Sequence, residues 1–134
     1  MRESRRHVVL SVEDELANQV LLRATLGRSP SLTDALMLLE APDLATAREI
    51  IGAESVDLVL LDVRLPDGNG LDLVPSLKQR GVDGPAVIVL SASVLPAERE
   101  RALGLGVDAF LSKPYRPAEL QAAVAKALSI AEAV

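Results

Sequence analysis

The sequence contains no cysteine, no tryptophan and a single histidine. The absence of cysteine excludes disulfide bonds, thiolate chemistry and cysteine-ligated metals, and it fits a reducing compartment. His7 begins an apolar run, at the opposite end from the acids that follow it, so neither a hydrolase triad nor a phosphohistidine is expected there. We therefore expect a cytoplasmic protein without disulfides or cysteine metal sites.

Aromatic residues are also scarce, and the two present, Phe110 and Tyr115, lie close together near the C-terminus. The core must therefore consist of leucine, valine, isoleucine and alanine. With 134 residues, of which 49% are hydrophobic, the chain can bury an ordinary core but has no room for a second domain. We predict a single domain over residues 1–134, with its core at about residues 7–129.

Long hydrophobic runs and basic clusters are missing as well. No apolar run reaches the roughly 18 residues needed to span a membrane. The first residues, MRESRRHVVL, lack the apolar segment and cleavage site of a signal peptide, so we expect a protein that is neither exported nor bound to a membrane. The net charge of −5 argues against direct nucleic-acid binding and leaves room for a cation.

The most informative stretch is residues 56–70, VDLVLLDVRLPDGNG. Its apolar run leaves no polar face, which predicts a strand covered on both sides in a parallel sheet and ending at Asp62. The turn-forming residues 66–70 then lead the chain away from the sheet. Ligands of open α/β sheets bind outside the carboxyl ends of the strands, where Asp62 would lie. The alternative is that Asp62 only caps the next helix.

Apolar runs alternate with segments of helical periodicity along the whole chain. We predict strands at residues 7–12, 36–39, 56–61, 86–90 and 109–111, and helices at about residues 16–24, 43–52, 71–79, 96–103 and 117–128. Pro75 conflicts with a helix interior, so the third helix should begin late or bend there. The pattern predicts an α/β fold, a doubly wound (βα)5 domain whose parallel sheet has right-handed crossovers.

Polar residues follow four of the five predicted strands. These residues are Glu13, Asp14, Asp62, Ser91 and Lys113. Carboxylates that meet at one edge of a sheet repel each other, and a divalent cation such as Mg²⁺ removes that repulsion. The lysine adds a positive charge for a phosphoryl oxygen, and the serine adds a hydroxyl donor. Such a set favours attack of a carboxylate on phosphorus, which gives an aspartyl phosphate.

The segments VVLSVEDE, VDLVLLDVRLPDGNG, AVIVLSAS and GVDAFLSKPY, in this order and spacing, resemble the receiver domain of two-component response regulators. The resemblance covers nearly the whole chain. It implies the flavodoxin-like fold of the CheY-like superfamily, a doubly wound domain with a five-stranded parallel sheet in the order 2-1-3-4-5.

The resemblance also implies a role for individual residues. Asp62 is the expected phosphoacceptor, and the expected ligands of Mg²⁺ or Mn²⁺ are Glu13, Asp14, Asp62 and the backbone carbonyl of Arg64. The expected phosphate contacts are Ser91, Ala92 and Lys113, the expected switch residues are Ser91 and Phe110, and Pro114 is expected to follow a cis peptide bond. Glu13 departs from the family, in which aspartate is commoner, and its extra methylene could alter the metal geometry.

Partners follow from the same resemblance. We expect a sensor histidine kinase or a histidine phosphotransfer protein as donor, an output partner or effector domain, and a phosphorylation-dependent homodimer. The expected output surface comprises residues 96–103, 109–111 and the last helix. One alternative is an aspartate-nucleophile phosphohydrolase, although Arg64 stands where such enzymes carry a second aspartate. Another is a degenerate receiver that only binds a partner. The chain is expected to be a stand-alone receiver or a piece of a longer protein.

Overall fold

The computed structural model describes residues 6–79, 81, 84–93 and 95–130. Its main sheet consists of five parallel strands, β1 His7–Val12, β2 Leu36–Ala41, β3 Leu58–Asp62, β6 Ala86–Ser91 and β7 Ala109–Ser112. Their order is β2-β1-β3-β6-β7. Since β4 Arg64–Leu65 and β5 Gly68–Asn69 form a separate antiparallel hairpin, this order is the predicted 2-1-3-4-5. The fold prediction is confirmed.

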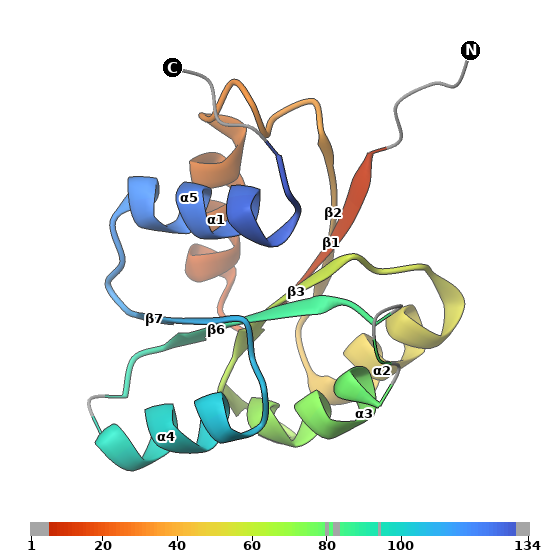
Figure 1. Cartoon of the computed structure of the whole chain (residues 1–134), viewed down its shortest axis with the longest axis vertical. Coiled ribbons are helices and arrows are strands. Elements are labelled where there is room, and N and C mark those ends of the chain that lie inside the picture. The colour runs from red at the N-terminus through yellow and green to blue at the C-terminus, as the bar shows by residue number, and fades with distance from the viewer. Residues whose placement is uncertain (1–5, 80, 82–83, 94, 131–134) are drawn as a thin grey trace.

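Helices cover both faces of the sheet, as Figure 1 shows. Helices α1 Leu16–Gly27 and α5 Pro117–Ala127 lie on one side, and α2 Leu44–Ala53, α3 Val74–Lys78 and α4 Pro96–Gly104 lie on the other. The helices of the crossovers therefore form one layer on each face, which makes the sheet doubly wound. No helix in the described part of the chain is long and apolar enough to cross a membrane.

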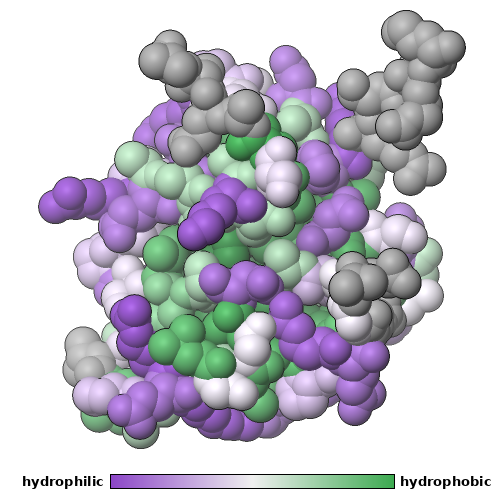
Figure 2. All heavy atoms as spheres, viewed as in Figure 1, coloured by the Kyte–Doolittle hydropathy of each residue, from purple (hydrophilic) through white to green (hydrophobic). Residues whose placement is uncertain are grey.

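Two aliphatic clusters fill the spaces between the sheet and these layers. One packs β-strand residues against α2, α3 and α4, with Val59, Leu61 and Val74 almost fully buried. The other packs them against α1 and α5, with Leu60 and Leu120 almost fully buried. On the face seen in Figure 2, hydrophobic residues gather toward the middle, and hydrophilic residues lie around and between them. The prediction of a core without large aromatic residues is confirmed.

The structure differs from the predicted elements at several boundaries, three of which are larger or more informative than the rest. Strand β3 begins at Leu58, and Val56 is buried before it. Strand β2 continues to Ala41, past the predicted end at residue 39. The segment before α3 forms a 3-10 turn, η1 Gly70–Leu73, and α3 itself begins only at Val74. Pro75 thereby falls in the first turn, where a missing N–H costs no hydrogen bond, so the predicted late start is confirmed.

Candidate functional site

Three carboxylates meet at the carboxyl edge of the sheet. Glu13 and Asp14 directly follow β1, and Asp62 is the last residue of β3. The two strands are hydrogen-bonded neighbours, with Val12 paired with Leu61, so their ends lie side by side. One oxygen of each carboxylate lies within 4.8 Å of one oxygen of the others. The predicted convergence of these acids is confirmed by the geometry.

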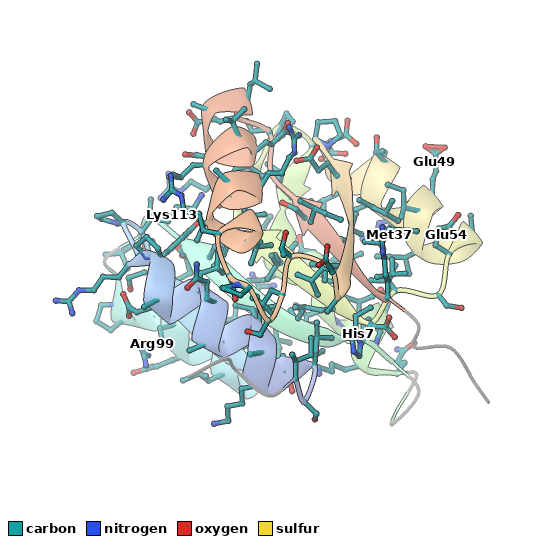
Figure 3. All side chains as sticks on the ribbon, turned by 90° about the horizontal axis from the view of Figure 1, so that it is seen from above. His7, Met37, Glu49, Glu54, Arg99 and Lys113 are labelled. Atoms are coloured by element: carbon teal, nitrogen blue, oxygen red, sulfur yellow. The ribbon has the colours of Figure 1, made fainter. Side chains whose placement is uncertain are left out.

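Lys113 reaches the same edge from the end of β7. Its Nζ donates a hydrogen bond of 2.8 Å to Oε1 of Glu13 and lies 3.5 Å from Oδ2 of Asp62. The peptide bond to Pro114 is cis, as the resemblance implies. Lys113 lies beside both carboxylates, and its closer partner is Glu13. Figure 3 shows Lys113 far from His7, which lies at the other end of β1.

The electrostatics of the three side chains are linked. Burial raises the pKa of Asp62, and the neighbouring Glu13 raises it further, whereas Lys113 and the nearby backbone N–H of Arg64 lower it only in part. Burial also acts to raise the pKa of Glu13, but the hydrogen bonds from Lys113 and from the backbone of Glu15 outweigh burial and hold it below its ordinary value. The ionised form of Asp62 is therefore the poorly compensated charge of this site.

Burial alone would lower the pKa of Lys113, but its hydrogen bond to Glu13 and the charge of Asp62 raise it. The lysine therefore stays protonated at neutral pH. One ammonium faces three carboxylates, so the pocket retains an excess of negative charge. Carboxylate oxygens and a backbone carbonyl are the ligands that Mg²⁺ and Mn²⁺ prefer. The donor set of this pocket fits such a cation.

Two cavities flank Asp62. The first, of about 240 Å³, brings together six of the predicted site residues with two that were not predicted, Glu15 and Asn18. The six are Asp14, Asp62, Arg64, Ser91, Ala92 and Lys113. The second, of about 330 Å³, lies on the α1 side and has a mostly apolar lining that includes Leu22, Leu60 and Tyr115. Asp62 therefore lies between a polar cavity and a mostly apolar one.

The two predicted switch residues have partners on α4. The hydroxyl of Ser91 donates a hydrogen bond to the carboxylate of Glu98, and its oxygen accepts one of 3.0 Å from the backbone N–H of Ser93. The guanidinium of Arg99 lies 5.6 Å from the centre of the Phe110 ring. Sequence reasoning missed both contacts, because the helical pattern of residues 96–103 does not show which of its side chains reach the neighbouring strands.

The fold and the site define a class of protein, a doubly wound α/β domain with an acidic cation pocket, a lysine and a hydroxyl at the carboxyl edge of its sheet. Residues 9–125 match the family model of the response regulator receiver domain. The chain belongs to this family, a domain of two-component signalling, and the phosphohydrolase alternative is thereby set aside.

Individual relatives agree with this assignment. The response regulator protein PilR of Pseudomonas aeruginosa is 38% identical over 125 residues, which are 93% of this chain and 27% of PilR. The KDP operon transcriptional regulatory protein KdpE of Escherichia coli is 38% identical over 120 residues, which are 90% of this chain and 50% of KdpE. The chain thus spans half or less of these two relatives.

A solved structure extends the comparison to the metal. The receiver domain of a sensor histidine kinase from Pseudomonas aeruginosa PAO1 has a magnesium ion coordinated in its active-site cleft. It superimposes on this chain with a TM-score of 0.77 and 26% sequence identity, and the match covers 92% of this chain and 98% of that one.

Proposed function

We propose that this domain accepts a phosphoryl group on Asp62 in a reaction that requires Mg²⁺ or Mn²⁺, and that the modification changes the surface formed by α4, β7 and α5. The observation that carries the proposal is the position of Asp62. Of the three clustered carboxylates, only Asp62 combines three features: it ends the central strand, it contacts Lys113, and it lines both cavities.

The chemistry is a displacement at phosphorus. A carboxylate oxygen of Asp62 attacks the phosphorus of a phosphohistidine, the P–N bond breaks, and the imidazole leaves with the bonding pair and takes a proton from solvent. Lys113 neutralises one phosphoryl oxygen. Glu13, Asp14, Asp62 and the Arg64 carbonyl would hold the cation, which supplies positive charge to the phosphoryl oxygens. Ala92, which lines the cavity beside Asp62, would contact the phosphoryl group through its backbone.

The switch uses the hydroxyl of Ser91. Once Asp62 carries phosphate, that hydroxyl gains a charged acceptor within the same cavity, and turning toward it would vacate space beside β6. Phe110 on the neighbouring strand β7 is only partly buried and can rotate into this space. The phosphoryl group thereby biases a packing element with two arrangements.

The partners follow from the reaction class. The donor is a sensor histidine kinase or a histidine phosphotransfer protein, and the receiver of the signal is an output partner, an attached effector domain or a second copy of the domain. The domain assists its own phosphorylation and dephosphorylation, and residues 1–134 act as one unit. The lack of cysteine supports placing it in the cytoplasm.

Intact-mass measurement with Mg²⁺ and acetyl phosphate tests the proposal. We expect the mass of one phosphoryl group on the wild-type protein, no added mass on Asp62→Asn, and none in excess chelator. Phosphorylation that persists in Asp62→Asn would refute the assignment of the acceptor. A wild-type protein that binds Mg²⁺ but never gains mass, with this donor or a phosphohistidine protein, would identify a receiver that acts only as a binding module.

A further inference from the structure

Outside the acidic pocket, both oxygens of one carboxylate, that of Asp67 at the turn of the β4–β5 hairpin, bind the backbone of a distant helix. Both of its oxygens accept hydrogen bonds from the first turn of α2, one of 2.9 Å from the backbone N–H of Leu44 and one of 3.0 Å from that of Ala45. These donors hold the pKa of Asp67 below its ordinary value. Asp67 is thus ionised at neutral pH and joins two segments that are more than 20 residues apart.

The two hydrogen bonds to Asp67 do more than cap α2, because the helix already has a capping residue of its own. Asp43, the residue before α2, accepts a hydrogen bond of 2.8 Å from the N–H of Thr46. The side chain of Asp67 supplies acceptors for the two remaining N–H groups in front of it. Asp67 therefore adds a second cap to α2, and this cap differs from Asp43 in that it attaches the β4–β5 hairpin to the helix.

The turn of the hairpin also packs directly against α2. Gly68 has a φ of +147°, which disfavours any side chain, and a Cβ there would lie 3.2 Å from Cδ1 of Leu44. Leu44 is buried in the core cluster on this face of the sheet, as are Ala47 and Ile51 further along α2. The hairpin is therefore fastened to a helix that is itself anchored in the core.

The other end of the hairpin, away from its turn, lies against the backbone of Asp62 and Val63. Gly70 donates a hydrogen bond of 2.6 Å from its N–H to the carbonyl of Val63, and a Cβ on Gly70 would overlap the carbonyl oxygen of Asp62. Arg64, the first residue of β4, lines the same cavity as Asp62, and its N–H approaches the Asp62 carboxylate. Movement of the hairpin would therefore move the Arg64 peptide relative to the pocket.

We propose that Asp67 is a positioning residue for the acidic pocket: by fastening the hairpin of residues 64–69 to α2, it holds the Arg64 peptide beside Asp62 and so sets the affinity for the divalent cation. This inference rests on the proposed function, since it assumes the Arg64 carbonyl as a metal ligand. Partners that orient a metal ligand typically change metal affinity by about 10- to 100-fold. Because Asp67 acts through a peptide segment, we expect the lower end of this range.

The test compares Asp67→Ala and Asp67→Asn with Asp43→Ala, which removes the other acidic cap of the same helix but leaves the hairpin attachment in place. Mn²⁺ affinity is measured by water-proton relaxation, the Asp62 and Arg64 amides are followed by NMR, and thermal unfolding checks the fold. We expect Asp67→Ala to weaken Mn²⁺ binding about tenfold and to shift both amides. Asp67→Asn, which keeps one acceptor oxygen, should lie between it and the wild type.

The control separates positioning from stability. Asp43→Ala should lower thermal stability without a comparable loss of Mn²⁺ affinity. Equal losses of affinity in the two alanine variants, or wild-type affinity in Asp67→Ala, would overturn the inference while leaving the proposed function intact. If Asp67→Ala does not fold, wild-type Mn²⁺ affinity in Asp67→Asn would overturn it in the same way. A wild-type protein that binds no Mn²⁺ would instead overturn the proposed function and this inference with it.

Discussion

Replacement of Glu98 by alanine should shift the unphosphorylated domain toward the conformation proposed for the phosphorylated one. In the structure the Ser91 hydroxyl donates to the Glu98 carboxylate. A serine hydroxyl has one proton to donate, so it cannot donate to Glu98 and to a phosphoryl group on Asp62 at once. The two acceptors compete, and Glu98 stabilises the resting arrangement.

The expected size of the shift follows from this one contact. A hydrogen bond to a charged group contributes about 1.5–3 kcal/mol. Glu98 is only partly buried, on the first turn of α4, which favours the lower end. A change of about 1.4 kcal/mol alters an equilibrium roughly tenfold, so Glu98→Ala should raise the minor, switched population about tenfold. Glu98→Gln, which keeps a neutral acceptor, should produce a smaller shift.

The assay is NMR of the resting protein, of the variants and of the beryllofluoride-bound wild type. Beryllofluoride should move signals throughout residues 91–120, and the signals of Glu98→Ala should lie part of the way along the same paths. Glu100→Ala, an exposed residue of the same helix, is the control for loss of one charge from α4. The reasoning is refuted if Glu98→Ala matches Glu100→Ala, or if its effect persists when Ser91→Ala is also present.

Three further outcomes are expected. In excess chelator at pH 7, Asp62→Asn should unfold at a higher urea concentration than the wild type, with a gain in stability on the order of 1 kcal/mol. The pKa of Asp62 is raised in the folded state, so its ionisation destabilises the fold once the pH rises above the ordinary aspartate pKa near 4. The gain should vanish below that pH, and a loss of stability at pH 7 would contradict the argument. Mg²⁺ at about 100 times its Kd should stabilise the wild type by about 2.7 kcal/mol, measured by urea unfolding. Asp14→Ala should reduce this stabilisation more than Glu13→Ala does, since Glu13 is already paired with Lys113. Glu13→Asp, whose side chain is one methylene shorter, should weaken the Lys113–Glu13 hydrogen bond and leave Lys113 freer to contact Asp62. Phosphorylation by acetyl phosphate, measured as added mass over time, should therefore be faster. An unchanged rate would show that Glu13 does not compete with Asp62 for Lys113.

Much of the fold and of the pocket could be predicted from the order of residues alone. The apolar run before Asp62 predicts a buried parallel strand, and its alternation with helical segments leaves a doubly wound sheet as the consistent arrangement. Parallel strands bring their carboxyl ends to one edge, so the convergence of Glu13, Asp62 and Lys113 required no knowledge of side-chain positions. Pro75 likewise predicted that the third helix begins late or bends, because proline restricts the backbone locally, and α3 does begin late.

The tertiary structure alone decided which side chains pair with which. Lys113 lies 100 residues from Glu13, and Asp67 lies 23 residues from Leu44. Glu98 is only seven residues from Ser91, but a turn separates the strand of one from the helix of the other. Periodicity and turn chemistry depend on neighbours within a few residues, whereas these contacts depend on the reach and rotamer of each side chain after the layers have packed. The sequence by itself therefore determined the sheet and the edge where the pocket lies, and packing determined that Lys113 pairs first with Glu13, Ser91 with Glu98 and Asp67 with α2.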